Sequence, residues 1–407
     1  MHFFKNVSLS AFSAGFVAVL VGFTSSVAIV FQAAQAFQAS PEVIASWMWS
    51  LGLGMGLCTL VPSLWLRKPV MVAWSTPGAA VLATAGLAGG FSMAEAVGAF
   101  MLCAVLITLC GVTGWFERVM NHLPVAIASG LLAGVLTRFG LQAFVAAQTA
   151  LPLVLLMLFT YLVGKRLLPR YTVPLTLLSA IVFVAFQAGF TKMQIDFGLA
   201  SPVWVTPVFT LSAAISLALP LFVVTMASQN LPGVIAIQAA GYGRPPGGAP
   251  GSGLPISKII TLTGLATLVL APFGAFALNL SAITAAICMG REAHPDPDKR
   301  YTAAVACGLL YVLIGLFGGT ITGVLTAFPK ELIAGIAGLA LLGTIGSALT
   351  TALRDDLHRE AALITFLVTL SGVVIAGVGS AFWGVLAGAL ALFVQQYGKS
   401  HFAPPAP

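Results

Sequence analysis

The stretch Trp74-Ser75-Thr76-Pro77-Gly78-Ala79-Ala80 interrupts an apolar segment and restarts it with the features of a helix N-terminus. Ser75 or Thr76 can cap the new helix, and Pro77 suits its first turn because that position needs no backbone N–H. Residues 70–74, which lead into the break, are predicted to be extended and buried, because unpaired backbone is not tolerated in lipid. The sequence therefore predicts a helix that begins inside the protein.

A second stretch of this kind, Asn279-Leu280-Ser281-Ala282-Ile283-Thr284-Ala285-Ala286, follows 206 residues later. Gln32-Ala33-Ala34 recurs as Gln238-Ala239-Ala240 at the same offset. Each match is weak in a Gly- and Ala-rich chain, but their order and near-constant spacing favour an internal repeat. Residues 275–279 are again predicted to be extended, and residues 281–289 form only about 13 Å of helix.

The composition places the chain in a lipid bilayer. Hydrophobic residues make up 59% of the 407 residues, charged residues 7%, and the mean hydropathy is +1.03, which leaves too little polar surface for a soluble globule. Residues 8–31 are predicted to be a first span and not a cleaved signal. The five cysteines lie in apolar segments without metal-ligand spacing and are expected to be buried, so no metal or cofactor is expected.

We predict an all-α polytopic protein with fourteen spans, at about residues 8–31, 43–66, 69–89, 93–116, 122–141, 150–168, 172–190, 210–231, 256–274, 278–291, 301–325, 331–353, 359–377 and 379–397. With both termini in the cytoplasm, all of the 18 Lys and Arg face inward except Lys192, Lys330 and the intramembrane Arg138. The net charge of +7 is therefore an orientation signal. Nucleic acid is not an expected partner.

Each half of the chain would hold seven spans, residues 1–207 in the first and 208–407 in the second. Because seven is odd, the second half enters the membrane in the opposite orientation, which makes an inverted repeat. Spans three and ten are the interrupted ones in corresponding positions. Such a pair indicates a binding site near the bilayer midplane.

The two half-helix starts predict a site for an anion, because their backbone N–H groups and dipoles point at one spot. Ser75, Thr76, Ser281 and Thr284 would add hydroxyl groups, although plain helix capping would explain the same residues. In span eight, the polar cluster Ser228, Gln229 and Asn230 can donate to a carboxylate or can instead join helices to each other. In span one, Thr24, Ser25 and Ser26 face the same region. Trp74 and Phe276 are either aromatic walls of the site or ordinary core residues.

All eleven acidic residues lie at span ends or in loops, so a carboxylate-based sodium site and a cationic substrate are not expected. If protons are coupled, Glu292 and His294 after span ten are the best titratable candidates, with a solvated turn paired to Arg291 as the alternative. Arg138 is a gate or pathway candidate, or else its side chain extends to the membrane surface.

Four motifs resemble the benzoate:proton symporter (BenE) family of bacterial aromatic-acid transporters, and the likeness extends over nearly all the spans. They are Ala73-Trp74-Ser75-Thr76-Pro77-Gly78-Ala79-Ala80, Thr225-Met226-Ala227-Ser228-Gln229-Asn230, Ala282-Ile283-Thr284-Ala285-Ala286-Ile287-Cys288 with Glu292-Ala293-His294-Pro295-Asp296, and Gly379-Ser380-Ala381-Phe382-Trp383-Gly384.

The resemblance implies the uracil permease-like fold. In that fold spans 1–4 and 8–11 form a core that holds substrate, and spans 5–7 and 12–14 form a gate domain, often at a homodimer interface. Nucleobase carriers of this fold have acidic residues in spans eight and ten, where this chain has Gln229 and Asn279. That difference argues against a nucleobase and suits an anion.

The sequence thus predicts a transporter that imports an aromatic carboxylate, such as benzoate, with a proton across the inner membrane. A carrier of another substrate, such as a nucleobase or inorganic anion, and an anion channel are the alternatives. An intramembrane enzyme is disfavoured, because no nucleophile–base pair or metal set occurs at depth.

Overall fold

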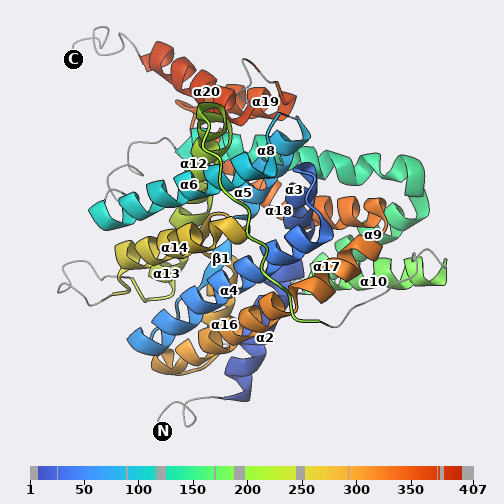
Figure 1. Ribbon diagram of the computed structural model, residues 1–407, viewed down its shortest axis with the longest axis vertical. Coiled ribbons are helices and arrows are strands. Elements are labelled where there is room, and N and C mark those ends of the chain that lie inside the picture. The colour runs from blue at the N-terminus through green and yellow to red at the C-terminus, as the bar shows by residue number, and fades with distance from the viewer. Residues whose placement is uncertain are drawn as a thin grey trace, which may run out of the picture.

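The computed structural model describes residues 8–24, 26–88, 90–114, 116, 125–168, 171–187, 198–243, 253–291, 293–373, 375 and 380–396 (Figure 1). Within these residues, 8 helical stretches are long and apolar enough to cross a membrane, and several shorter apolar helices accompany them. The protein is therefore a multi-pass membrane protein. As predicted, all five cysteines are buried and unpaired.

The described residues of the first half contain one short strand, and most of the others are helical. Ser40 caps the second long helix, and Ser92 with Glu95 forms a capping box at the start of another. The elements are α2 (Leu9–Thr24), α3 (Val27–Ala36), α4 (Pro41–Leu66), β1 (Val72–Trp74), α5 (Thr76–Leu87), α6 (Met93–Thr113), α8 (Val125–Val145), α9 (Ala147–Leu167) and α10 (Thr172–Phe186).

The second half also contains one strand, and its first long helical stretch has two π-helical turns, η2 and η3. The elements are α11 (Leu211–Ala213), η2 (Ala214–Ala218), α12 (Leu219–Thr225), η3 (Met226–Asn230), α13 (Leu231–Ala239), α14 (Ile256–Leu270), η4 (Ala271–Phe273), β2 (Leu278–Leu280), α15 (Ile283–Cys288), η5 (Pro297–Lys299), α16 (Tyr301–Leu316), α17 (Gly318–Ala327), α18 (Lys330–Leu353), α19 (Arg359–Ser371) and α20 (Ser380–Gln396).

Several predicted segment boundaries differ from those of the structure. Span eight was predicted to end at residue 231, before Pro232, but helix continues to Ala239. Pro232 stands in the first turn of α13, where a proline is tolerated. The segment predicted at 301–325 is two helices, α16 and α17, because the chain leaves helical geometry at Phe317, just before two glycines. The half-helix predicted at 281–289 is shorter, Ile283–Cys288.

The two extended segments pair with each other. β1 runs antiparallel to β2 with Val72 opposite Leu280, Ala73 opposite Asn279 and Trp74 opposite Leu278. Two further backbone bonds of 3.0 Å lengthen this ribbon, Ser75 N–H to Ala277 O and Ser281 N–H to Met71 O. The half-helices α5 and α15 therefore start at the two ends of one small ribbon.

Side chains of the surrounding helices satisfy the outward N–H groups of the ribbon, as a buried sheet edge requires. The contacts join Val72 N–H to Thr59 Oγ1 (3.1 Å), Trp74 N–H to Met55 Sδ (3.1 Å), Leu278 N–H to Thr267 Oγ1 (3.1 Å) and Leu280 N–H to Asn230 Oδ1 (2.9 Å). These partners fix the ribbon to α4, α14 and η3.

Close helix packing surrounds the ribbon. α4 packs along α16, α6 along α14, and α8 along both α18 and α19, while α9 packs against α10. The α4–α16 contact depends on glycine, because a Cβ on Gly52 would lie 2.5 Å from the Cα of Gly315. Gly274, with φ +102°, brings the backbone before β2 against Trp47.

Residues 198–210, which we name the strap, cross the surface between the two halves as extended chain, green in Figure 1. Four of its backbone N–H groups bond to other elements: Ala200 to Leu316 O (2.7 Å), Val203 to Ser46 Oγ (2.9 Å), Val205 to Pro272 O (2.8 Å) and Val208 to Ala94 O (2.9 Å). The strap is thus bonded to α4, α6, α16 and η4.

Candidate functional site

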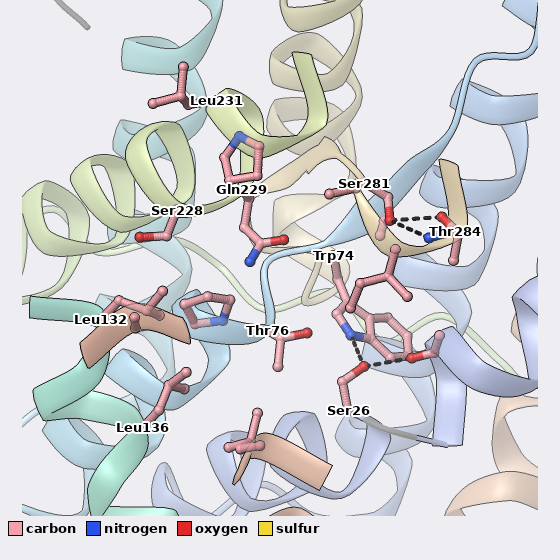
Figure 2. Close-up of a pocket in the computed structure, with 18 of the residues that line it drawn as sticks. Ser26, Trp74, Thr76, Leu132, Leu136, Ser228, Gln229, Leu231, Ser281 and Thr284 are labelled. Atoms are coloured by element: carbon pink, nitrogen blue, oxygen red, sulfur yellow. Dashed lines mark hydrogen bonds between the residues drawn. The ribbon is translucent and has the colours of Figure 1, made fainter. Parts of the chain in front are cut away.

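A cavity of about 470 Å³ lies where the two half-helices begin. Residues of α2, β1, α5, η3, α15 and α16 line one side of it, and residues of α8 and α18 line the other. Its volume is within the range of about 300–1,000 Å³ that is usual for small-molecule sites. Figure 2 shows side chains from both sides around this space.

At the start of α5, Ser75 is a helix cap, and Thr76 and Pro77 line the cavity. Ser75 Oγ accepts the N–H of Gly78 (3.1 Å) and the hydroxyl of Thr225 (2.9 Å), and its side chain is buried. Because Pro77 has no N–H and that of Gly78 is used internally, this helix offers a ligand few backbone donors. Ser75 is therefore a helix cap, and Thr76 is the residue of this helix start whose hydroxyl is available to a ligand.

At the start of α15, Ser281 and Thr284 both line the cavity. The hydroxyl of Thr284 donates to Ser281 Oγ (2.7 Å), and Thr284 N–H approaches the same oxygen at 3.4 Å. Since Ser281 Oγ accepts these bonds, its own proton is left to donate to another acceptor. Ser281 is therefore the hydroxyl best placed to donate to a ligand.

Trp74 lines the cavity and is held in place from α2 and the start of α3 (Figure 2). Its Nε1–H donates to Ser26 Oγ (2.8 Å), and the Ser26 hydroxyl donates to Gly22 O (2.9 Å). The ring of Phe23 lies 5.6 Å from the indole, centroid to centroid. Ser26, which was predicted to face this region, lines the cavity, and so does Phe23, which was not predicted. The predicted Ser25 lies outside the described residues.

The π-helical turn η3 sends adjacent residues in different directions. Ser228 and Gln229 line the cavity, and Gln229 makes no side-chain hydrogen bond to any part of the chain that is described. Asn230 is instead buried, with Oδ1 accepting from Leu280 N–H (2.9 Å) and Nδ2 against Met226 Sδ (3.2 Å). Of the two predicted amides, only Gln229 is available to a ligand, and Asn230 holds β2.

Phe276 and Asn279 do not line the cavity. Phe276 is fully buried, with ring centroids 5.7 Å from Trp47 and 6.0 Å from Phe100, so it is a core aromatic. Asn279 is buried in the centre of β2, where its Nδ2 donates to Ala277 O (3.1 Å). Its Oδ1 has no hydrogen-bond partner within the described residues.

The opposite side of the cavity was not predicted from the sequence. Three residues of α8 (Ser129, Leu132 and Leu136) and four of α18 (Leu341, Ser347, Ala348 and Thr351) line it. On α18 the only signal is the pair Ser347 and Thr351, one helical turn apart in an apolar helix. This surface is mostly apolar and suits the ring of a ligand better than its polar group.

Arg138 on α8 does not line the cavity either. Its guanidinium lies against Gly372 (φ +69°), the residue that ends α19, where a Cβ would come within 2.7 Å of Nη1. A helix C-terminus favours positive charge. The arginine therefore joins α8 to the end of α19, and the glycine provides the space for it.

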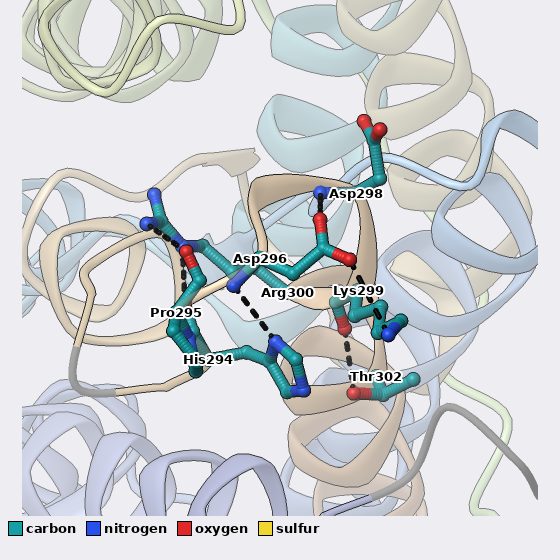
Figure 3. Close-up of polar contacts among 7 residues, drawn as sticks. All are labelled: His294, Pro295, Asp296, Asp298, Lys299, Arg300 and Thr302. Atoms are coloured by element: carbon teal, nitrogen blue, oxygen red, sulfur yellow. Dashed lines mark hydrogen bonds and ion pairs between the residues drawn. The ribbon is translucent and has the colours of Figure 1, made fainter.

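The turn after α15 is bonded internally (Figure 3). His294 Nδ1 accepts the N–H of Asp296 (3.0 Å), and the buried Arg300 donates to His294 O (2.8 Å) and to Met289 O at the end of α15 (2.9 Å). The N–H of Asp298 and the nearby Lys299 hold the pKa of the Asp296 carboxyl below its usual value. His294 thus lies outside the cavity lining, and Glu292 lies outside the described residues.

Comparison with known proteins gives consistent matches over nearly the whole chain. Residues 5–394 match a family model described as benzoate membrane transport protein. The chain is 47% identical over 381 residues to the inner membrane protein YdcO of Escherichia coli (strain K12), with 94% of each chain covered. It is 40% identical over 387 residues to the benzoate membrane transport protein of Acinetobacter baylyi, with 95% of each chain covered.

Solved structures with the same fold are more distant in sequence. The transmembrane domain of the cyanobacterium bicarbonate transporter BicA superimposes with a TM-score of 0.63 at 13% identity, covering 95% of this chain and 98% of that one. SLC26A9 superimposes with a TM-score of 0.52 at 13% identity, covering 94% of this chain and 65% of that one. At such identities the likeness concerns the fold alone.

Proposed function

Because the chain belongs to the benzoate membrane transport protein family, which consists of transporters and not enzymes, we propose that it imports benzoate or a similar aromatic carboxylate across the bacterial inner membrane together with a proton. The observation that carries the proposal is the cavity at the two half-helix starts. It combines an indole wall with hydroxyl and amide groups, which are the partners that an aromatic carboxylate needs.

In the proposed binding mode, the carboxyl group of the substrate lies between Ser281 and Gln229, with Thr76, Ser228 and Thr284 beside it. The ring lies against Trp74 and the apolar residues of α8 and α18. Ser75 and Asn230 support this arrangement without touching the substrate, since their polar atoms are bonded to Gly78 and Leu280. Phe276 and Asn279 belong to the same supporting layer.

We further propose the fourteen-segment inverted repeat, residues 1–207 and 208–407. The ribbon supports it, because Ala73 pairs with Asn279, the residue 206 positions later, as a two-fold axis between repeats requires. The same offset relates Ser75 to Ser281 and Met71 to Ala277, so the bond from Ser75 N–H to Ala277 O is the repeat-related counterpart of the bond from Ser281 N–H to Met71 O. It also relates Val72 to Leu278, whose N–H groups both bond to a threonine hydroxyl.

The packing of the helices supports a core of spans 1–4 and 8–11 that moves against a gate domain of spans 5–7 and 12–14. The gate helices α8, α18, α19 and α20 pack chiefly on one another. The cavity extends to Ser129 near the start of α8 and to Thr351 near the end of α18, beside Arg354. With both termini cytoplasmic, this conformation faces the cytoplasm. We propose that gate domains meet in a homodimer.

Uptake of labelled benzoate into proteoliposomes tests the proposed transport. We expect saturable uptake that rises when the outside is made more acidic, with Glu292 and His294 as the protein groups to examine first. Uptake that is independent of the pH gradient would rule out coupling to a proton. Uptake that never exceeded the outside concentration, and that failed to saturate, would instead indicate an anion channel.

A thermal-shift titration tests the substrate class. Benzoate is expected to raise the Tm of the purified protein, because a ligand that binds only the folded state stabilises it as its concentration exceeds Kd. Uracil, sulfate and bicarbonate are the comparison ligands. A Tm increase with one of these and none with benzoate would replace the proposed substrate.

A further inference from the structure

The cavity also bears on how the proton travels, and this step rests on the proposed function. We propose that the carboxyl group of the substrate itself carries the coupled proton, so that the aromatic acid crosses the membrane as a neutral molecule. No ionisable side chain of the protein then has to accept that proton. The argument has three parts: the charges around the cavity, its hydrogen-bonding groups and the positions of the nearest ionisable residues.

The described residues that line the cavity are all uncharged. Hydroxyl groups come from α3, α5, η3, α15, α8 and α18, one amide from Gln229, one indole from Trp74 and one phenol from Tyr311, and the remainder are apolar. Moving a carboxylate from water into such surroundings is costly unless a cation compensates it. Burial among neutral groups therefore favours the protonated acid over the anion.

The polar groups suit an undissociated acid. A carboxylic acid needs an acceptor for its O–H and a donor for its C=O. The primary amide of Gln229 offers both side by side and makes no other side-chain hydrogen bond within the described chain. Ser281 adds a donor, because its oxygen already accepts from Thr284. Figure 2 shows the Gln229 amide and the Thr76 hydroxyl directed into the same space.

Of the ionisable residues near the cavity, Arg354 follows the end of α18 and does not line the cavity, and the others are engaged elsewhere. On α8, the guanidinium of Arg138 lies against Gly372 at the end of α19. After α15, Arg300 bonds to Met289 O and His294 O, and the His294 ring to Asp296 N–H. On the cavity lining itself, Tyr311 of α16 is the ionisable side chain, buried beside Cys307 and Cys288. Glu292 follows α15 outside the described residues and is the rival proton carrier.

The proton balance is simple. On the loading side, a proton from water bonds to a carboxylate oxygen and forms the acid O–H. On the cytoplasmic side, this O–H bond breaks, and the proton and the carboxylate both enter water. Each cycle therefore moves one carboxylate and one proton, without net charge and without a change in protonation of the protein.

Calorimetric titration of the full-length protein with benzoate, repeated in buffers of different ionisation enthalpy, counts the protons taken up on binding. At neutral pH benzoate is ionised in solution, so we expect about one proton taken up per benzoate bound. The same uptake is expected for the double variant Glu292→Gln with His294→Gln and for the control Glu360→Gln. No uptake by the unaltered protein, or its loss in the double variant alone, overturns the inference.

Two analogues of benzoate, one neutral and one charged, provide a second measurement that needs no variant. Benzamide, a neutral isostere of the acid, is expected to compete with benzoate, and its affinity should not change with pH. Benzenesulfonate, which stays ionised, should not compete. The apparent affinity for benzoate should fall about tenfold for each unit by which the pH is raised. The reverse ranking of the two analogues overturns the inference and leaves benzoate transport intact. Failure of benzoate itself to bind removes the proposed function.

Discussion

Gln229 and Asn230 are adjacent amides in one π-helical turn, and their surroundings give them different roles. Gln229 faces the cavity, whereas Asn230 accepts the N–H of Leu280 in β2. We expect Gln229→Met, which keeps the volume, to weaken benzoate binding about tenfold, the value of one hydrogen bond. Its Tm should stay unchanged. Binding and thermal unfolding of the same preparations measure both effects.

The neighbouring variant Asn230→Leu is the matched contrast. It leaves the buried N–H of Leu280 without an acceptor, which costs about 1–3 kcal/mol of unfolding free energy. The expected result is a lower Tm in the absence of any ligand. If Asn230→Leu unfolded normally and lost only benzoate binding, the assignment of the two amides would have to be exchanged.

At the residue scale, the sequence identified Trp74, Thr76, Ser228, Gln229, Ser281 and Thr284, all of which line the cavity. Helix-start chemistry and polarity within an apolar segment were sufficient signals for them. For Phe276, which also precedes a half-helix, the sequence left open a cavity wall or a core aromatic, and the structure has it in the core. At the 206-residue offset, however, its counterpart is Val70, which is fully buried, and not Trp74. Comparing repeat-related positions would have placed it in the core.

At the scale of elements, the two breaks and the extended segments before them could be predicted, but their pairing could not. A bond between Ser75 and Ala277 joins residues about 200 positions apart, and three-residue strands carry no pattern that specifies a partner. The same holds for Thr59 and Thr267, whose hydroxyls accept strand N–H groups. A threonine in an apolar helix is otherwise unremarkable in sequence. The π-helical turns have no sequence signature either.

The packing of α4 on α16 gives a prediction at this scale. In Gly52→Ala the new Cβ would lie 2.5 Å from the Cα of Gly315, a backbone atom that cannot move alone. We expect a loss of about 1–3 kcal/mol of unfolding free energy, typical of an overpacked contact. A lower Tm with unchanged expression would be the direct measurement.

Gly343→Ala in α18 is the control, since nothing lies within 4 Å of a Cβ at that position. Alanine is a better helix former than glycine by about 1 kcal/mol, so this variant should be neutral or slightly more stable. Equal destabilisation by both substitutions would mean that glycine content, and not the α4–α16 contact, determines the effect.

At the scale of the whole molecule, the strap connects the two halves of the chain, and its backbone N–H groups bond to α4, α6, α16 and η4. Ser46 on α4 accepts Val203 N–H (2.9 Å) and donates to Phe273 O (2.9 Å). In Ser46→Ala, the backbone amide of Val203 loses its partner. Hydrogen exchange at Val203 and its neighbours should become about tenfold faster, the value of one lost bond.

Ser50 is the matched control, because it lies one turn further on α4, is equally buried, and donates to Phe273 O (3.2 Å) and to Trp47 O, neither of which belongs to the strap. Ser50→Ala should leave exchange at Val203 as it is. Faster exchange in both variants would show that the substitutions loosen α4 itself. The exchange rate at Val203 would then reflect the stability of α4 and not the loss of the Ser46–Val203 hydrogen bond.

Composition and periodicity predicted a multi-pass membrane fold at this scale, since apolar spans are a strong signal. The opposite wall of the cavity could not be predicted, because α8 and α18 contribute mainly leucine, serine and alanine. Those residues are common in every membrane helix, so only the packing of the helices shows which of them face the cavity.

The ribbon between the half-helices has a mechanical consequence. The beginning of β1 lies beside the end of β2, with Val72 opposite Leu280. Force applied to the two ends of the chain therefore reaches the ribbon at one end and opens its cross-strand bonds one after another. Bonds opened in sequence resist rupture less than bonds loaded together, so under such force we expect the ribbon to open like a zipper, beginning at Val72 and Leu280.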